Sequence, residues 1–565
     1  MAVQRHCPVK LKQMSLLPSS VRIWYTEENV RLFKGQKEDG ANRGEYSRTY
    51  LFIMADIHTD HAEDSRDASN RLKSDIDSSR HDRKIRKKNQ NSLRKRQQHM
   101  RIVYLGALAA ILVLILAVAG ITVQKKQAKR AAVRAERAAE IESEESALDA
   151  KRSVISQAET MAKGYDYDGA VALLQSQPTA DTDSELKSAI AKITAEKSMT
   201  SAVDTTDVPH IFFHSLIVDT DRAFNTKLWS ASDIAGTDAW MTTLDEFDKI
   251  IQQLYDNGYV LIRMRDLVTQ TTDADGTVHF TANKSLMLPE GKKPIVLSID
   301  DWSYYHTYEG HGYADKAVLD KNGEVKCQYT DAKGKVSVGD YDVVPRLNTF
   351  CEKHPDFSYR GARGLIAMTG YNGVFGYRTD TAYKTGENLD DGQKAWLKEH
   401  PDFNWDDEVA EAKKIADAVK SEGWEFACHT WGHLSVTNLP VEALETDQEK
   451  WQATVANITG KTDTIIFAHG ADIGTWKNYD ASTNADYAYL KSMGYNFYAN
   501  VDASSKYWIQ IRDGYVRQGR IDCDGYQMWR ALSGEAKINV FEDLFDVKSV
   551  FDSSRPTPVR AVGKA

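Results

Sequence analysis

Apolar and polar positions divide the chain into regions of different character. Residues 102–123 form an uninterrupted apolar run of 22 residues without a charged side chain. Residues 125–200 are rich in Ala, Glu, Lys and Arg, a composition typical of exposed helices. From residue 208 onward, short β-type runs alternate with amphipathic helical stretches. This alternation predicts an α/β domain with a parallel sheet and crossover helices, either open and doubly wound or closed as a barrel.

The individual elements of this domain follow from the period of the apolar residues. Amphipathic helices are predicted at 241–258, 406–423 and 485–494, the first two ending at a glycine. Tight Asp-Gly and Asn-Gly turns predict β-hairpins at 272–281 and 317–329. Strands are predicted within 210–218, 259–268, 292–301, 424–430, 462–470 and 495–502.

The apolar run at 102–123 predicts a single transmembrane helix, because about 20 apolar residues span a bilayer. A buried core helix would carry a polar face, and a cleaved signal peptide would lie nearer the N-terminus. The N-terminal flank, 83–101, carries nine Lys or Arg, and the C-terminal flank, 124–137, carries six. This bias predicts a cytoplasmic N-terminus and an extracellular C-terminal domain.

Two regions flank the predicted span. Residues 1–101 are predicted to be a disordered, basic cytoplasmic tail, in which 1–53 differs in character, so that translation is expected to start at Met54. Residues 124–203 predict a helical stalk that contains one tetratricopeptide-like hairpin. A stable array needs about three such repeats. We therefore favour a spacer over a partner-binding module for the stalk.

Composition excludes some classes of function. The chain of 565 residues is too long for one ordinary domain, and its net charge of −9 with a pI near 6.0 gives no indication of nucleic-acid binding. Five cysteines are too few and too scattered for a disulfide framework or a zinc ribbon. Cys327 and Cys351 are the one pair that we consider for an extracellular disulfide.

Two short strings carry the candidate chemistry. "LSIDDWSYY" places Asp300 and Asp301 at the end of one predicted strand, and "EFACHTWGHLSV" places His429 and His433 after another. Two imidazoles and one carboxylate form a divalent-metal site with a free position for water, and the spare carboxylate is a candidate base. Taken singly, an Asp-Asp pair is usually a solvated turn and an HxxxH string a surface feature. Their joint position at strand ends favours a hydrolytic metal site.

Two features lie beside these strings. Trp302 and Trp431 are candidates for stacking on sugar rings, with core packing as the equal alternative. Between Asp301 and His429, residues 354–380 are dense in Gly and Tyr. We predict that this segment is an elaborate loop region near the mouth of the site.

The strings resemble those of the NodB-homology polysaccharide deacetylases, carbohydrate esterase family four. "VPHIFFHSL" is similar to the opening strand of that family, "KPIVLSIDDW" to its first motif, and "HTWGH" matches its second motif, H-[ST]-x-x-H. "IFAHGADIG" lies where the third motif, R-x-P-Y-G, would fall. The resemblance covers roughly residues 208–556, and the long insertions are similar to those of a membrane-anchored Gram-positive subgroup. It implies a distorted (β/α) barrel over 205–556, followed by a short tail at 557–565.

The resemblance also implies roles for individual residues. Asp301, His429 and His433 would bind a divalent metal, most often Zn²⁺, with Co²⁺ and Mn²⁺ as alternatives. Asp300 would be the general base. The metal and the backbone N–H of His469 would hold the oxyanion, and the products would be acetate and a free amine on the sugar.

The chain departs from the family pattern in two places. Ile466 and Ala468 occupy the positions of the third-motif Arg and Pro, and His469 stands at the aromatic position. The late L-x-H histidine, which acts as the general acid in the family, has no counterpart, because no histidine follows His469. The candidate replacements are His469 itself, His306 or a metal-bound water.

These observations predict a membrane-anchored, metal-dependent hydrolase that removes N-acetyl or O-acetyl groups from a cell-wall or surface glycan such as peptidoglycan. The expected partners are the glycan and the lipid bilayer, through residues 102–123. One alternative is a catalytically degenerate homologue that binds glycan or acts as a scaffold in wall assembly. Another is a related amide or ester hydrolase with a different substrate.

Overall fold

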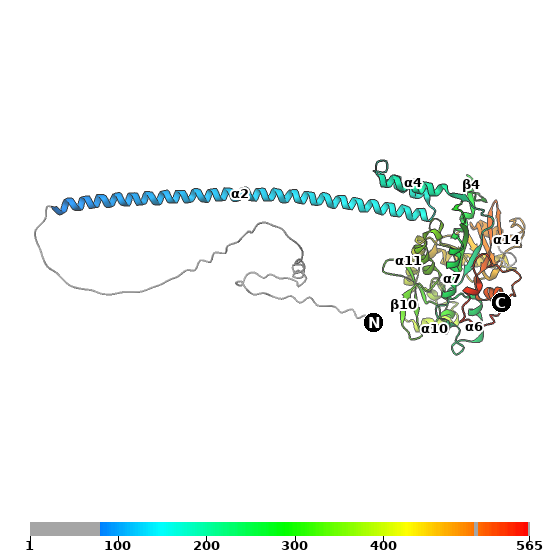
Figure 1. Ribbon diagram of the computed structural model, residues 1–565. Coiled ribbons are helices and arrows are strands. Elements are labelled where there is room, and N and C mark those ends of the chain that lie inside the picture. Colours follow the sequence, from blue (N-terminus) through cyan, green and yellow to red (C-terminus); the bar gives the residue numbers. More distant parts are fainter. Residues whose placement is uncertain (1–78, 502–506, 563–565) are drawn as a thin grey trace. The chain divides into compact units, whose positions relative to one another are not determined.

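The computed structural model describes residues 79–501 and 507–562, and the expectations about residues 1–53 and a start at Met54 lie outside this part. The chain divides into two compact units between Val123 and Gln124. The domain boundary predicted near residues 203–205 lies inside the second unit. This division does not test it, so it stays a prediction. Helix α2 (Ser79–Lys163) is continuous over 85 residues (Figure 1). Among the described residues it is the one helix long and apolar enough to cross a membrane, and residues 102–123 of it are exposed along their whole length.

Seven parallel strands close into a barrel, which confirms the predicted fold class. The ring closes because its last strand, β16 (Tyr515–Asp522), pairs with its first, β2 (His210–Phe213), while β7 (Lys293–Asp300) pairs with both β2 and β11 (Leu365–Met368). β3 (Tyr259–Leu261) extends the sheet beside β7, and β15 (Ile509–Arg512) lies antiparallel to β16. In order around the ring, the strands are β2 (His210–Phe213), β7 (Lys293–Asp300), β11 (Leu365–Met368), β12 (Glu425–Cys428), β13 (Thr464–Ile466), β14 (Phe497–Val501) and β16 (Tyr515–Asp522).

Alternate residues of the strands face the interior of the barrel and the surrounding helices. On β7, Val296 belongs to a cluster formed with inward residues of other strands, whereas Leu297 and Ile299 belong to the cluster that contains Phe247 and Ile250 of a surrounding helix. The register pairs Phe212 with both Ser298 and Asp522. Because paired residues of parallel strands point to the same face, the inward positions of β2, β7 and β16 lie at matching levels.

Helices cover the outside of the barrel. In α7 (Leu244–Asp256), Thr243 and Glu246 form a capping box, and the buried face contributes Phe247 and Ile250 to the core. The helices predicted within 241–258, 406–423 and 485–494 are confirmed by α7, α11 (Trp405–Ser421) and α14 (Ala485–Ser492). The other α-helices after the stalk are α5 (Thr220–Ala223), α6 (Ala231–Trp240), α8 (Val343–Lys353), α9 (Thr381–Thr385), α10 (Asp391–Glu399), α12 (Val441–Thr454), α13 (Ala456–Thr459), α15 (Gly525–Ser533) and α16 (Val547–Val550).

Small antiparallel sheets lie outside the ring of barrel strands. Both predicted hairpins are confirmed: β4 (Val268–Thr272) pairs with β5 (Val278–Ala282), and β8 (Lys316–Leu319) pairs with β9 (Val325–Thr330). β10 (Val336–Gly339) adds a third strand to the second hairpin. A further pair joins β1 (Thr200–Ala202) to β6 (Met287–Pro289).

The prediction that residues 354–380 form one loop region at the site was wrong. The short apolar run "LIAM" within it is β11, a fully buried strand that closes the ring between β7 and β12. A four-residue apolar run between Gly- and Tyr-rich segments carries little periodicity, so that the pattern concealed the strand. The segment therefore splits into a part that enters β11 and a part that leaves it towards the site.

A pair of helices within the predicted stalk forms a hairpin that packs against the barrel domain. α3 (Tyr167–Gln175) and α4 (Ser184–Ser198) share a buried cluster with barrel residues such as Val260 and Tyr359. Tyr165, in the turn before α3, stacks on Tyr359 with ring centroids 6.1 Å apart and donates a hydrogen bond to the Asp356 carbonyl at 2.6 Å. The hairpin and the barrel are thus joined by one continuous core.

Two residues singled out in the sequence are part of the core. Cys327 and Cys351 are both buried and free, so the structure does not form the disulfide that we considered. Trp302 is fully buried and packs against Phe375, which excludes the sugar-stacking role considered for it. Trp431 is partly exposed beside the motif histidines.

Candidate metal centre and active site

The two neighbouring aspartates leave β7 in different directions. β7 ends at Asp300, and the next residue, Asp301, adopts the left-handed conformation with φ of 55°. Asp tolerates this conformation better than most residues. Asp300 contacts Arg520, while Asp301 contacts His433. This turn allows two adjacent carboxylates to serve different partners.

The histidine pair lies on a loop that follows β12. His433 has φ of 52°, so that the four-residue spacing of the two histidines spans a turn and not a helix. Asp447, on α12, accepts hydrogen bonds from the backbone N–H groups of Trp431 and Gly432, both at 2.7 Å. No pattern in the sequence indicated this role of Asp447. Its carboxylate fixes the turn that carries both imidazoles.

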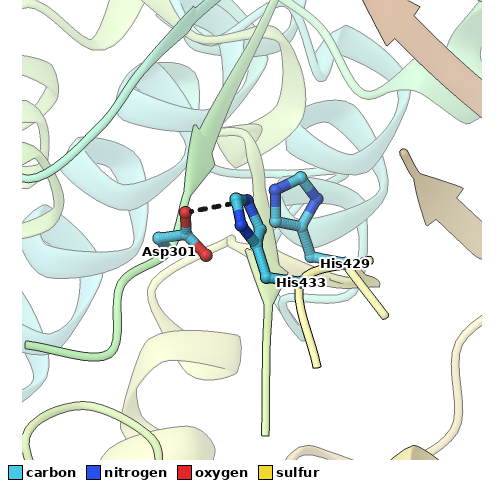
Figure 2. Close-up of side chains that lie close together, drawn as sticks. All are labelled: Asp301, His429 and His433. Carbon is cyan, nitrogen blue, oxygen red and sulfur yellow. Dashed lines mark ion pairs between the residues drawn. The ribbon is translucent and has the colours of Figure 1, made fainter. Parts of the chain in front are cut away.

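Asp301, His429 and His433 converge on one point. Their candidate ligand atoms all lie within 4.8 Å of one another, and Asp301 Oδ2 is 3.3 Å from His433 Nε2 (Figure 2). His429 Nδ1 lies 2.7 Å from the Ile466 carbonyl, which requires the proton on Nδ1 and leaves Nε2 free as a ligand. Tyr305 donates to Asp301 Oδ1 at 2.7 Å. The donor set and its supporting hydrogen bonds therefore fit a divalent cation.

The protonation states of His429 and Asp301 also suit a cation. Burial lowers the pKa of His429, so that its imidazole is neutral near pH 7. Burial alone would raise the pKa of Asp301, but its electrostatic interactions with His433, His429 and His214 outweigh burial and lower the pKa. A metal binds the neutral imidazole and the ionised carboxylate.

Arg520 holds the second carboxylate, Asp300. The guanidinium, on β16, donates to Asp300 Oδ1 at 2.7 Å and to Oδ2 at 2.8 Å. Burial raises the pKa of Asp300, but the Arg520 charge, helped by His429, lowers it far below its ordinary value. Asp300 Oδ2 lies 3.7 Å from His429 Nε2. An ionised carboxylate is therefore fixed beside the three candidate ligands.

Sequence reasoning missed Arg520. It identified Ile466 at the position where the family carries its motif arginine, and it had no reason to search the last strand. Inside the barrel, Arg520 Nη1 also donates to Ser298 Oγ at 3.1 Å, and the guanidinium lies over the Phe212 ring at 3.9 Å. His210 Nε2 contacts the same Ser298 hydroxyl at 2.9 Å. This buried polar layer sets the orientation of Arg520.

His214 is a second residue that sequence reasoning missed. It follows β2 directly, one position beyond the register pair of Phe213 and Ile299, at the level of Asp300. Its Nδ1 atom is buried without a hydrogen-bond partner, although the ring as a whole is partly exposed. Burial lowers its pKa, while the charges of Asp300 and Asp301 oppose that shift. An imidazole with an unengaged nitrogen therefore lies within electrostatic range of the two aspartates.

Of the two histidines proposed as replacement acids, the structure places His469 next to the candidate ligands and His306 away from them. The His469 ring lies 4.2 Å from the His433 ring, and its Nε2 atom is 3.0 Å from the His433 carbonyl, so that His469 borders the site. His306 contacts Glu309 through Nδ1 at 2.7 Å and the Tyr383 hydroxyl through Nε2. Both nitrogens of His306 are thus engaged away from the three candidate ligands.

A pair of buried carboxyls ends β16. Asp522 and Asp524 interact electrostatically, and one oxygen of each is buried without a hydrogen-bond partner. Burial and the neighbouring Asp524 raise the pKa of Asp522, and burial raises the pKa of Asp524 to about 7. At least one proton is therefore retained by the pair near neutral pH.

Comparison with known proteins agrees with this geometry. Residues 392–495 match the family model described as polysaccharide deacetylase. The matched segment contains His429, His433 and His469. This segment is therefore similar to polysaccharide deacetylases, in agreement with the resemblance to the NodB-homology deacetylases.

One solved structure is also similar, the Streptococcus pyogenes deacetylase PplD in complex with acetate. The likeness covers 61% of this chain and 100% of that one, at 13% identity and a TM-score of 0.29. No curated protein sequence matches the chain.

Proposed function

We propose that the protein is a membrane-anchored, metal-dependent deacetylase that removes N-acetyl groups from a cell-wall or surface glycan. The observation that carries the proposal is the convergence of Asp301, His429 and His433 beside an ionised Asp300. The deacetylase class rests on the family match, and the metal, the substrate and the anchoring are our inferences. O-acetyl groups are a second substrate for the same chemistry.

The three ligands would hold one divalent cation, Zn²⁺ by the chemistry of two imidazoles and one carboxylate. Such a cation polarises a carbonyl and lowers the pKa of water. Asp300 accepts the proton of the attacking water, because its carboxylate is ionised and lies 3.7 Å from His429 Nε2. Arg520 positions that carboxylate through two parallel hydrogen bonds.

The leaving amine needs a proton, and we assign His214 to relay to it the proton that Asp300 takes from the attacking water. Its unengaged Nδ1 and its level beside Asp300 support this role. The backbone N–H of His469 is assigned to the developing oxyanion, as its position beside His433 suggests. Acetate and a free amine on the sugar are the products.

A degenerate scaffold was the main rival, because the third motif is altered and no late histidine follows His469. Arg520 and His214 offer a guanidinium and an imidazole beside the same aspartate. These two side chains favour catalysis over the scaffold.

The anchoring part of the proposal rests on the apolar composition of residues 102–123 within α2. We propose a single span with the N-terminus in the cytoplasm and the deacetylase domain outside, where cell-wall glycans lie. Residues 124–203 would then form the stalk, and residues 205–556 the catalytic domain.

The experiment that tests the function is acetate release by the purified full chain in detergent, supplied with Zn²⁺ or Co²⁺. The substrates are N-acetylglucosamine oligomers and peptidoglycan. We expect acetate release with either glycan. Stoichiometric metal binding without acetate release from either one would favour the scaffold.

A further inference from the structure

Tyr305 lies in the "LSIDDWSYY" string, four residues after the candidate ligand Asp301, and the proposed reaction gives it no role. Its side chain is buried, and its hydroxyl donates to Asp301 Oδ1 at 2.7 Å. The other oxygen, Asp301 Oδ2, lies 3.3 Å from His433 Nε2. The two oxygens of this carboxylate therefore have different partners. Oδ1 accepts from the phenol, and Oδ2 points to the group of candidate ligands.

The hydroxyls of Ser303, Thr369 and Tyr305 form a buried network whose direction follows from the number of their protons. An ionised carboxylate only accepts, so the single phenol proton points to Asp301. Thr369 Oγ1 also contacts the Tyr305 hydroxyl and must donate to it. Ser303 Oγ lies 3.2 Å from Thr369 Oγ1 and donates in turn to that atom. Every hydroxyl of the network thus directs its proton towards Asp301, an arrangement that strengthens each bond.

Packing fixes the ring of Tyr305 as well as its hydroxyl. The Tyr371 ring stacks on it, with centroids 4.6 Å apart and planes 11° from parallel. The Tyr308 ring meets it edge-on at 5.6 Å. Thr369 and Tyr371 both follow β11, the neighbour of β7 in the barrel, so the support comes from a second strand. A side chain locked in this way holds its hydrogen-bond acceptor in one orientation.

We propose that Tyr305 is a positioning residue of the candidate metal centre, because it occupies Asp301 Oδ1 and leaves Oδ2 as the one carboxylate oxygen for the cation. A carboxylate that binds through both oxygens takes two coordination positions, whereas a hydrolytic site keeps a position for water. Hydrogen-bond partners of metal ligands orient those ligands and contribute to the metal affinity. This inference rests on the metal site of the proposed function and adds the residue that sets how Asp301 binds.

The test measures the affinity of the purified full chain in detergent for Zn²⁺, by competition with a chelator. Tyr305→Phe keeps the stacked ring and removes only the hydroxyl. Tyr308→Phe is the matched control, because it removes the hydroxyl of a neighbouring ring in the same aromatic group. We expect Tyr305→Phe to weaken Zn²⁺ binding about 10- to 100-fold and Tyr308→Phe to bind as the wild type does.

A second pair of variants tests the network from its other side and does not depend on the folding of Tyr305→Phe. Thr369→Val keeps the size of the side chain and removes the hydroxyl that donates to Tyr305. We expect it to weaken Zn²⁺ binding about three- to fivefold, less than Tyr305→Phe does. Thr369→Ser keeps the hydroxyl and should restore the wild-type affinity.

The melting temperature separates positioning of the ligand from a general loss of stability. A ligand that binds only the folded state raises the melting temperature according to its affinity. We therefore expect the rise produced by Zn²⁺ to be smaller in Tyr305→Phe than in the wild type and in Tyr308→Phe. A lower melting temperature of the metal-free variant with an unchanged Zn²⁺-induced rise shows a purely structural role and overturns the inference.

The outcome for the wild type separates this inference from the proposed function. A wild type that binds Zn²⁺ with the same affinity as Tyr305→Phe and Thr369→Val overturns the inference and leaves the metal site in place. A wild type that binds neither Zn²⁺, Co²⁺ nor Mn²⁺ overturns the proposed metal site, and the inference falls with it.

Discussion

Arg520 donates hydrogen bonds to both carboxylate oxygens of Asp300, at 2.7 and 2.8 Å, although the two residues are 220 positions apart in the chain. The pair is almost fully buried. A buried guanidinium–carboxylate pair fixes geometry, because a shift of either side chain breaks two charge-assisted hydrogen bonds. In the proposed reaction, Arg520 keeps the base, Asp300, ionised and holds its carboxylate in place beside the three candidate ligands.

Arg520→Lys should lower kcat for acetate release by at least about tenfold, because a lysine cannot make the bidentate contact. The metal content should not change, since Arg520 is not a ligand. Arg512→Lys, on the neighbouring strand β15, is the matched control and should retain activity. In the Asp300→Asn background, Arg520→Lys should add no further loss. Additive losses in the double variant would contradict the proposed coupling.

Asp301→Ala and His429→Ala should each abolish stoichiometric zinc binding, because each removes one of three protein ligands. Asp300→Asn should keep the metal, because Asp300 pairs with Arg520 and is assigned no ligand role. The measurement is the zinc content of the purified full chain, determined by elemental mass spectrometry. Unchanged metal in Asp301→Ala would refute the ligand assignment.

His214→Gln should lower the rate of amide deacetylation by about 10²- to 10⁴-fold, as expected for loss of a general acid. Hydrolysis of p-nitrophenyl acetate should fall far less, because its leaving group departs without a proton. Comparison of the two substrates thus separates proton donation from a general effect on structure. His306→Gln is the control and should retain both activities. A similar loss with both substrates would assign His214 to another role.

Asp524→Asn should stabilise the protein more at pH 8 than at pH 5. The folded-state pKa of Asp524 is raised to about 7, above its ordinary value of 3.8, so its stability contribution is present below pH 3.8 and is lost as the pH rises through about 7. Asn still caps α15, where Asp524 Oδ1 accepts from the Gln527 N–H at 2.6 Å. We expect the gain in melting temperature at pH 8 to exceed that at pH 5 by about 2–4 °C. An equal gain at both pH values would contradict a raised pKa.

The sequence predicted the parts of the site that lie in compact strings. Asp300 and Asp301 end one apolar run, and His429 follows another, so their position at the carboxyl edge of a barrel could be anticipated. Local patterns sufficed because each motif is formed by neighbouring residues. The hairpins and the amphipathic helices were predictable for the same reason.

Arg520 and His214 were not predictable in this way, because their place depends on how the ring closes. β16 pairs with β2, so that residues from the two ends of the domain lie side by side. A search for a histidine late in the chain therefore missed the one that follows the first strand. β11 was missed for a different reason, since four buried residues are too few to show a period.

The central claim is that this site removes acetyl groups with Asp300 as its base. The most direct measurement is acetate released from an N-acetylglucosamine pentamer by the metal-loaded full chain, wild type against Asp300→Asn, with product mass recorded. The account predicts release of acetate and a free amine by the wild type, a rate lower by at least about 10²-fold in the variant, and equal metal content in both. Equal rates in the two proteins, or no release by a wild type that carries its metal, would contradict it.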